Sequence, residues 1–253
     1  MKPIAFVFPG QGSQAVGMLD AWGDHPAVLE TLAEASDALG EDIGALIANG
    51  PKEDLALTTN TQPVMLVAGV ACWRAWRAEG GALPAAVAGH SLGEYSALVA
   101  AEALPLAEAV PLVRLRAQAM QQAVPVGTGA MAAILGLDAS KVIAGCAEVT
   151  GAMGQNGTEV VEAVNFNDPV QTVIAGTKAA VEKACEVLKG MGAKRALPLP
   201  VSAPFHSSLM KPAAERLKGA LESVDFADPK IPVVNNIDVA IESDHDRIRD
   251  ALY

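Results

Sequence analysis

Apolar and polar residues along the first half of the chain form blocks that predict short buried strands separated by helices. Residues 3–8 and 85–89 are short apolar runs bounded by proline or glycine, which is typical of buried strands. Helices are predicted at 26–39, 62–79, 92–102 and 105–122. The second of these is apolar on every side between Pro63 and Cys72, so we expect it to be buried.

The order of elements changes after residue 127. Strands are predicted at 131–135, 160–166, 172–175 and 195–199, and helices at 138–149 and 178–191. A turn at Asn167-Asp168-Pro169 separates the middle strands, and the β-α-β-β-α-β order is typical of a ferredoxin-like fold. A helix at 209–224, a strand at 231–234 and a helix at 244–252 follow. We therefore predict an α/β protein with a core formed by residues 1–127 and 199–253 and a small inserted domain formed by residues 128–198.

Composition narrows the class of protein. The chain has 253 residues, of which 51% are hydrophobic and 4% aromatic, as expected for a well-buried α/β core. Its formal net charge is −11 and it has no basic tract, so a nucleic-acid partner is not expected. The N-terminal apolar run is too short for a signal peptide or a membrane span, so no membrane association is expected either.

The spacing of cysteines and histidines indicates the cellular compartment and whether a metal site is expected. Cys72, Cys146 and Cys185 are isolated and lack C-x-x-C spacing, which suits a reducing compartment, so we expect a cytoplasmic protein. The four histidines show no metal-ligand spacing. We therefore expect neither a metal nor another cofactor.

The candidate nucleophile is Ser91, within the sequence Gly89-His90-Ser91-Leu92-Gly93, which fits the G-x-S-x-G pattern. In this pattern a sharp turn from a strand to a helix lifts a serine hydroxyl clear of the sheet, where it can attack an acyl carbon. The predicted strand 85–89 and helix 92–102 supply the required context. The alternative is a serine in an ordinary tight turn.

A serine hydroxyl needs a base within hydrogen-bond reach to act as a nucleophile near neutral pH. Because the histidine follows the serine in hydrolases of this kind, the candidates are His206 and His245. His245 lies in a charged helix, whereas His206 lies in a loop that enters a helix, so we predict His206 as the base. The alternative for His206 is a structural role at the start of that helix. His90, adjacent to Ser91, is predicted to line the pocket, and no acidic third member stands out.

Arg116 is predicted to lie on the inward face of the helix 105–122. Its neighbours on that face are Leu112, Val113, Met120 and Ala123, whereas Arg114, Gln118 and Gln121 form a polar stripe. A buried guanidinium is unfavourable unless it meets an anion. That anion is either an internal carboxylate or a carboxylate of the substrate, which arginine can hold with two hydrogen bonds. Met120 is a further candidate for the substrate pocket.

A glycine-rich turn, Phe8-Pro9-Gly10-Gln11-Gly12-Ser13-Gln14, follows the first predicted strand. It lacks the Gly-Lys-Ser/Thr ending of a phosphate loop and a complete G-x-G-x-x-G, so nucleotide binding is not favoured. A turn at the end of a parallel strand is well placed to donate a backbone N–H to an oxyanion. Leu92, directly after Ser91, is predicted to donate the other.

Together these segments resemble the malonyl-CoA:acyl carrier protein transacylases of bacterial fatty-acid synthesis. The motifs that carry the resemblance are Phe8-Pro9-Gly10-Gln11-Gly12-Ser13-Gln14, Thr61-Gln62-Pro63, Gly89-His90-Ser91-Leu92-Gly93-Glu94-Tyr95, Arg116, Gly127-Thr128-Gly129-Ala130-Met131, Val164-Asn165-Phe166-Asn167 and Pro204-Phe205-His206. They span nearly the whole chain. The resemblance implies an α/β-hydrolase-like core with a ferredoxin-like small domain, in agreement with the pattern of predicted elements.

The resemblance also implies roles for the candidate residues. Ser91 would be the nucleophile, and His206 would act first as general base and then as general acid. The backbone N–H groups of Gln11 and Leu92 would form the oxyanion hole, and Arg116 would bind the malonyl carboxylate. The implied reaction moves a malonyl group from malonyl-CoA, through a seryl ester, to the phosphopantetheine thiol of acyl carrier protein.

Substrate selectivity and partners follow from the same resemblance. The side chain of Phe205, beside the base, is expected to disfavour methylmalonyl groups. Malonyl-CoA and acyl carrier protein are the expected partners of a monomeric enzyme. Because carrier proteins are acidic, the candidates for docking are the basic residues Lys189, Lys194, Arg195 and Lys211.

Two features depart from the family's pattern. Asp168-Pro169-Val170 stands where a Pro-Gly turn is usual, and we expect only a local effect. Family members also continue past the position of Tyr253, through an Asn-Pro-Val loop whose backbone carbonyl orients the histidine. We therefore expect a chain of this length to be less soluble or less active than a longer one.

Two other functions remain open at this point. A serine esterase or thioesterase would use the same nucleophile with water as acceptor, and a catalytically impaired form would only bind carrier protein. An inward-facing Arg116 argues against the first, because hydrolases of neutral esters have no use for a buried cation.

Overall fold

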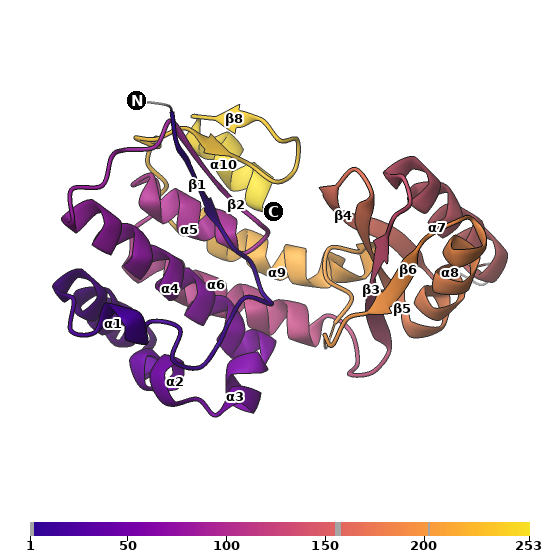
Figure 1. Cartoon of the computed structure of the whole chain (residues 1–253), viewed down its shortest axis with the longest axis horizontal. Helices are drawn as coiled ribbons and strands as arrows, with labels where there is room; N and C mark the ends of the chain where they lie inside the picture. The colour runs from indigo at the N-terminus through magenta and orange to yellow at the C-terminus, as the bar shows by residue number, and fades with distance from the viewer. Residues whose placement is uncertain (1–2, 155–157, 202) are drawn as a thin grey trace. The chain divides into compact units, whose positions relative to one another are not determined.

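The computed structural model describes residues 3–154, 158–201 and 203–253. The chain divides into two compact units: unit 1 comprises Met1–Gln118 and Leu217–Tyr253, and unit 2 comprises Ala119–Arg216. Each unit combines a sheet with helices (Figure 1). The chain is therefore a mixed α/β protein, as predicted.

The sheet of unit 1 has the strand order β1 (Ala5–Phe8), β2 (Ala86–Gly89), β7 (Val233–Val234) and β8 (Ile241–Glu242). The first three are parallel, with Phe8 opposite Gly89 in the register, and β8 is antiparallel to β7. The parallel strands lie where the apolar runs predict them. The antiparallel strand β8 was not predicted, because a two-residue strand shows no alternation that a sequence pattern could reveal.

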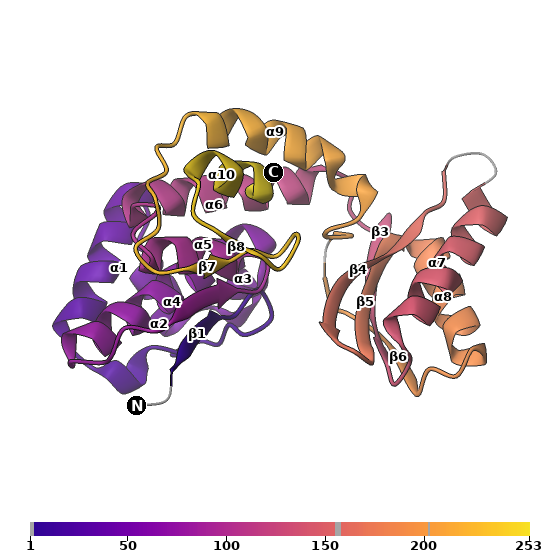
Figure 2. The same ribbon diagram turned by 90° about the horizontal axis from the view of Figure 1, so that it is seen from above.

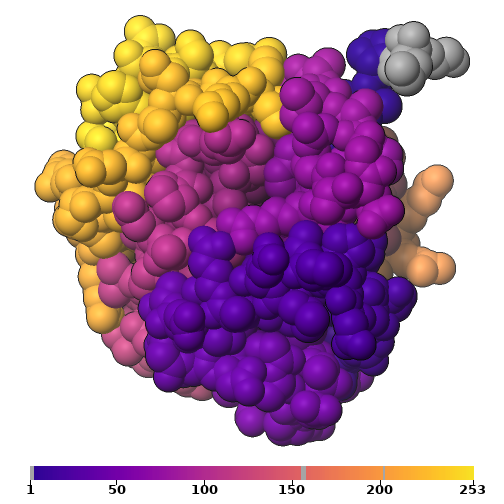
Figure 3. Space-filling model, turned by 90° about the vertical axis from the view of Figure 1, so that its left-hand side faces the viewer, coloured from indigo at the N-terminus to yellow at the C-terminus, as the bar shows by residue number. Residues whose placement is uncertain are grey.

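Helices cover part of this sheet (Figure 2), whereas Val7 of β1 is 71% exposed. The helices of unit 1 are α1 (Pro26–Leu39), α2 (Ile43–Asn49), α3 (Lys52–Ala56), α4 (Thr58–Ala78), α5 (Gly93–Ala100) and α10 (His245–Leu252). Helices α6 (Leu106–Gln122) and α9 (Lys211–Glu222) belong partly to unit 1 and partly to unit 2. On one side of unit 1, α1 to α3 and their connections form a continuous surface (Figure 3). Val64, Leu66 and Val67 of α4 are fully buried, as its apolar sequence predicts. No helix within the described ranges is both long and apolar enough to span a membrane.

Unit 2 contains the predicted β-α-β-β-α-β sequence of elements. These are β3 (Gly129–Leu135), α7 (Ala139–Met153), β4 (Val161–Asp168), β5 (Gln171–Thr177), α8 (Lys178–Gly190) and β6 (Arg195–Pro198). The strands form an antiparallel sheet with the order β4-β5-β3-β6. Helices α7 and α8 lie on one face of it (Figure 1).

The predicted turn between β4 and β5 is wrong by two residues. Asn167 and Asp168 belong to β4, and Asp168 pairs with Gln171. The turn therefore consists of Pro169 and Val170 alone, and the N–H of Val170 donates to Asp168 Oδ1 at 3.0 Å. Asparagine and aspartate often mark turns, but here Asp168 continues the strand through its pairing with Gln171, and Asn167 lies at an irregularity of the register between Phe166 and Asp168.

The two faces of the β3–β6 sheet bury different clusters. Ala132, Ile134 and Ile174 pack with residues of α7 and α8 on one face. Because side chains alternate along a strand, Met131 and Val173 point to the opposite face. A second cluster there includes Met120, at the end of α6, and Phe205.

Candidate active site

The site is built at the carboxyl ends of the three parallel strands of unit 1, where ligands bind in open α/β sheets. The turn after β1 and the turn after β2 touch there: the N–H of His90 donates to the carbonyl of Phe8 at 3.0 Å. A Cβ on Gly10 would lie 2.6 Å from the His90 carbonyl oxygen. Only glycine therefore allows the first turn to approach the second so closely.

The glycines of the G-x-S-x-G motif are explained by equally close contacts. A Cβ on Gly89 would lie 1.8 Å from the carbonyl carbon of Gly93, and a Cβ on Gly93 would lie 2.2 Å from the carbonyl oxygen of Phe8. Ser91 between them has a φ of 51°, in the left-handed region that serine rarely adopts. The strand, the strained turn and helix α5 follow one another as the motif predicts.

The side chain of Arg116 lies beside the Ser91 hydroxyl. Its guanidinium donates to Gln62 Oε1 at 2.6 Å and to Ser91 Oγ at 3.2 Å, and it lies over the Tyr95 ring at 5.7 Å from the ring centre. Arg116 is 9% exposed, and its burial lowers the pKa of the guanidinium. Burial also raises the pKa of Tyr95 to about 12, so that ring is neutral near pH 7.

The predicted alternative for Arg116, an internal ion pair, is not found. Among the described residues no carboxylate lies within ion-pair distance of Arg116. By contrast, Arg114, two residues earlier on the same helix, pairs with Glu41 at 2.6 Å. Arg116 thus carries a buried positive charge whose protein partners are uncharged oxygens and a ring face. Such a group favours binding of an anion.

The two predicted oxyanion donors lie on the two touching turns. Leu92 is 1% exposed at the N-terminal cap of α5, and the side chain of Gln11 donates to Thr58 Oγ1 at 3.1 Å. Within the residues that the structure describes, neither the Gln11 N–H nor the Leu92 N–H donates to another protein group. Both are therefore available as donors, and the positive end of the α5 dipole adds to the attraction for negative charge.

The other predicted site residues divide between the units. His90 is exposed in unit 1 and belongs to the strand-to-helix turn at residues 89–94, which we call the elbow. In unit 2, Phe205 and Met120 are 8% and 9% exposed and belong to one cluster. His206 follows Phe205 and is exposed, with a φ of 64° that only a minority of non-glycine residues adopt.

Three residues near Ser91 were missed as site residues in the sequence. Gln62 contacts Arg116, and Asn236 and Glu94 contact the elbow. The sequence offered a signal for two of them. Gln62 is a polar residue in a helix predicted to be buried, and Asn236 follows the third parallel strand, at the carboxyl edge of the sheet where ligands bind. Glu94 had none, because an acidic residue in the first turn of a helix is common.

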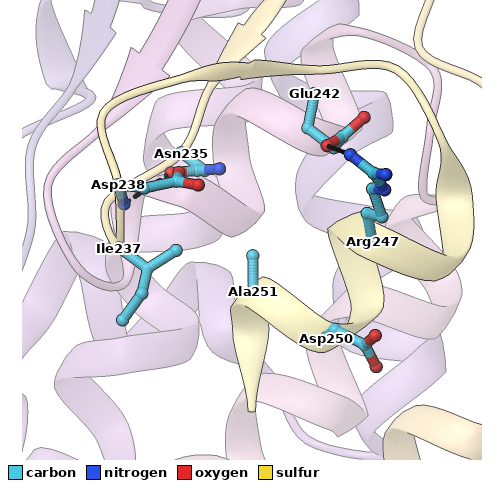
Figure 4. Close-up of a pocket in the computed structure, with 7 residues that line it drawn as sticks. All are labelled: Asn235, Ile237, Asp238, Glu242, Arg247, Asp250 and Ala251. Atoms are coloured by element: carbon cyan, nitrogen blue, oxygen red, sulfur yellow. Dashed lines mark hydrogen bonds and ion pairs between the residues drawn. The ribbon is translucent and has the colours of Figure 1, made fainter.

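A hollow of about 300 Å³ lies between the β7–β8 loop and α10. Its lining residues are Asn235, Ile237, Asp238, Glu242, Arg247, Asp250 and Ala251 (Figure 4). Arg247 pairs with Glu242 at 3.6 Å. None of the predicted site residues lines it, and the part of the chain that the structure describes contains no His, Cys, Asp and Glu group suited to a metal ion.

Comparison with known proteins identifies the family. The acyl transferase domain family matches residues 5–253. The malonyl CoA-acyl carrier protein transacylase of Salmonella typhimurium is 56% identical over 253 residues, which are all of this chain and 80% of that protein. The structure of an acyl-carrier-protein S-malonyltransferase from Burkholderia pseudomallei is 66% identical, with a TM-score of 0.94 over 99% of this chain and 80% of the other.

A further solved structure is of a type II PKS acyl-carrier protein in complex with its malonyl-transacylase. It is 53% identical, with a TM-score of 0.94 over 99% of this chain and 80% of that one. The similarity thus extends along nearly the whole chain, including the segments that hold the elbow and the arginine described above. This chain belongs to the acyl transferase domain family and, within it, to the malonyl CoA-acyl carrier protein transacylases.

Proposed function

We propose that this chain transfers a malonyl group from malonyl-CoA to the phosphopantetheine thiol of acyl carrier protein, in fatty-acid synthesis. The observation that carries the proposal is the buried Arg116 guanidinium, 3.2 Å from the Ser91 hydroxyl and without a carboxylate partner among the described residues. An acyl group that bears its own carboxylate would supply the missing anion. The solved relative in complex with an acyl-carrier protein supports the choice of acceptor.

The reaction has two similar halves. Ser91 Oγ attacks the thioester carbonyl carbon of malonyl-CoA while its proton passes to His206, and the N–H groups of Gln11 and Leu92 stabilise the negative oxygen. The carbon–sulfur bond then breaks, and coenzyme A leaves as a thiol with the proton from His206. In the second half, the carrier thiol gives its proton to His206 and attacks the malonyl-serine ester. Ser91 leaves as a hydroxyl when that proton returns to it.

We extend the proposal to the architecture. Unit 1, with its parallel strands and strained elbow, is best described as an α/β-hydrolase-like core, and the antiparallel strand order of unit 2 suits a ferredoxin-like fold. The domain bounds 1–127 with 199–253 and 128–198 are our working assignment. A cytoplasmic location is supported by three free cysteines at positions 72, 146 and 185.

Selectivity for malonyl over methylmalonyl groups is assigned to Phe205. The ring is 8% exposed and packed in one cluster with Met120 and Met131, so it cannot easily move aside for an added methyl group. We expect kcat/KM for methylmalonyl-CoA to be about tenfold or more below that for malonyl-CoA. Comparable values for the two substrates would refute this role.

Intact-mass measurement tests the proposed function. After mixing with malonyl-CoA, the protein should gain the mass of one malonyl group, which peptide mapping should locate at Ser91. The S91A variant should gain nothing, and H206A should acylate far more slowly. Loss of the malonyl group only on addition of carrier protein indicates a transferase, whereas its loss in buffer alone would indicate a thioesterase. A wild-type protein that stays unmodified would contradict the proposal.

A further inference from the structure

The side-chain amide of Asn236 connects the three parts of the elbow. Its Oδ1 accepts a hydrogen bond from the backbone N–H of Ser91 at 3.1 Å. Its Nδ2 donates to the carbonyl oxygen of Gly89 at 2.7 Å and also to Glu94 Oε2. One amide therefore links the end of β2, the strained residue and the first turn of α5.

We propose that Asn236 and Glu94 are positioning residues that hold the Ser91 elbow in its reactive conformation. The proposal rests on the proposed role of Ser91 as the nucleophile. Neither residue would touch the substrate. Asn236 would act through the backbone of Ser91, and Glu94 would act through Asn236.

The orientation of the Asn236 amide follows from its three partners. Two of them, Gly89 O and Glu94 Oε2, are acceptors, and the third, the Ser91 N–H, is a donor. Rotating the amide by 180° would set its NH₂ group against an N–H and its oxygen against two oxygens. Only a side-chain amide in this orientation supplies both the acceptor and the donors that the three partners require. An ionised carboxylate has no N–H group to donate.

Glu94 holds Asn236 in place. Its Oε2 atom accepts from the Asn236 backbone N–H at 3.1 Å as well as from Nδ2. Glu94 is 5% exposed, although it belongs to a residue type that is rarely buried without a specific partner. The two hydrogen bonds from Asn236 explain why the Glu94 carboxylate is buried. They attach the loop after β7, which carries Asn236, to the first turn of α5.

The elbow needs such support because its conformation is unfavourable. Ser91 has a φ of 51°, and a residue held in this region persists only where its surroundings determine its backbone. The bond from the Ser91 N–H to Asn236 opposes rotation about φ, which would move Oγ away from the Arg116 guanidinium. A loosened elbow would also displace the adjacent Leu92 N–H.

Replacing Asn236 with aspartate tests the inference. N236D keeps the acceptor for the Ser91 N–H but removes both donors and sets a carboxylate against Gly89 O and Glu94. We expect kcat for malonyl transfer to fall about 10- to 100-fold, with KM for malonyl-CoA changed by less than about threefold. Amide hydrogen exchange at Ser91 and Leu92 should become at least about tenfold faster.

A matched control separates this effect from added charge. N235D introduces the same charge at the neighbouring residue, whose Oδ1 accepts from the Asp238 N–H rather than from the elbow. Its kcat and elbow exchange should stay within about twofold of wild type. Equal losses in N235D and N236D would overturn the proposal, as would an N236D protein with wild-type kcat and exchange.

Variants of Glu94 give an independent route should N236D fail to fold. The Gln Oε1 of E94Q can accept both bonds from Asn236, so E94Q should retain kcat within about threefold, whereas E94A should lose about tenfold or more. E94A with wild-type exchange at Ser91 would refute the role of Glu94. If the wild-type protein takes up no malonyl group, the proposed function fails, and the exchange measurements alone then decide whether Asn236 and Glu94 hold the elbow.

Discussion

At the scale of single residues, we propose that the environment of Arg116 determines which acyl group the site favours. Its hydrogen bonds to Gln62 and Ser91 go to uncharged oxygens, and a guanidinium has five N–H donors, so it can bind a ligand as well. A neutral acyl chain would leave a buried charge unmatched, whereas a second carboxylate would match it. A transferase specific for malonyl groups has a use for this cation, and an esterase of neutral acyl groups does not.

Removing this guanidinium should change selectivity more than stability. For R116A we expect kcat/KM for malonyl-CoA to fall about 100-fold or more, because a charge-assisted two-bond contact is lost. Activity on uncharged acyl thioesters should rise relative to malonyl-CoA. The free energy of unfolding should change by no more than about 2 kcal/mol, because the lost hydrogen bond to Gln62 is offset by removal of a desolvated charge. Steady-state kinetics with both thioesters and urea unfolding measure these effects.

Arg114 provides the control for that substitution. It lies on the same helix and pairs with Glu41, which is 60% exposed in its side chain, so R114A should keep both activities within about twofold. If R116A lost activity equally on charged and uncharged acyl thioesters, the proposed carboxylate-binding role would be wrong.

We expect Glu94 to make the free energy of unfolding depend on pH. Burial is the largest cause that raises the pKa of its carboxyl group above the usual value, while Asn236 and Arg116 lower it and Asp238 raises it. Because the folded state holds this proton more tightly than the unfolded chain, the resulting stabilisation is complete below about pH 4.3, the usual pKa of glutamate. It is lost as pH rises through the higher pKa of the folded state.

The E94Q variant cannot ionise and should not show this loss. We therefore expect the free energy of unfolding of wild type minus that of E94Q to decrease as pH rises from about 4 through the raised pKa. Urea unfolding of both proteins across this range measures the difference. A difference that stays constant with pH would show that Glu94 does not titrate in this way.

At the scale of elements, the strand-elbow-helix unit could be predicted and most of its surroundings could not. The G-x-S-x-G spacing predicts a sharp turn between a strand and a helix. Glycine is needed at positions 89 and 93 because a Cβ at either position would clash with neighbouring backbone atoms. Helices α2 and α3, of seven and five residues, were not predicted because they are too short to show a helical period. Their stability comes from burial of Ile43, Ile47 and Leu55 rather than from local preference.

The close approach at Gly89 predicts a large effect of a single methyl group. Alanine there would place Cβ 1.8 Å from the carbonyl carbon of Gly93, so the strand and helix must separate. We expect G89A to lower the free energy of unfolding by about 3 kcal/mol or more and to abolish acylation of Ser91. Urea unfolding and intact-mass acylation measure the two effects.

Gly219 offers a matched substitution without the clash. It lies inside α9 and is exposed, and apart from the neighbouring backbone of its own helix no atom lies within 4 Å of the position that a Cβ would take there. G219A should therefore stabilise the protein by about 0.5–1 kcal/mol. A G89A protein as stable and as active as G219A would contradict the explanation of the motif.

At the scale of the whole molecule, we expect charge to govern association with the carrier. The chain has a net charge of −11, so an acidic carrier protein must meet a locally basic surface. The candidate residues Lys189, Lys194, Arg195 and Lys211 are all exposed. They are the basic positions that we expect to steer the encounter.

Salt should weaken this encounter. We expect kcat/KM for acyl carrier protein to fall about tenfold when ionic strength rises from about 0.05 to 0.5 M, because charges beyond the Debye length are screened. K194E should raise KM for the carrier and reduce the salt dependence. K141E, at an exposed position of α7, is the control and should change neither. If K194E and K141E had the same KM for the carrier and the same salt dependence, Lys194 would not be part of the docking surface.

The sequence by itself determined the features that depend on neighbours along the chain. The elbow at Ser91, the inward face that carries Arg116 and the order of elements in unit 2 all follow from short motifs and from periods of two or 3.6 residues. The resemblance to a known family then implied a reaction, because it indicated malonyl as the acyl group and His206 as the base.

Only the tertiary structure decided how distant segments meet at the serine. Gln62 lies 54 residues from Arg116, and Asn236 lies 145 residues from Ser91, yet both pairs are hydrogen-bonded. No periodicity encodes such contacts. Asn236 reaches Ser91 because parallel strands pair in register and bring the loops at their carboxyl ends to one edge, whereas the contact of Gln62 with Arg116 joins helices α4 and α6. The folded chain leaves the Arg116 charge without a carboxylate partner among the described residues and places the amide of Asn236 against the strained elbow.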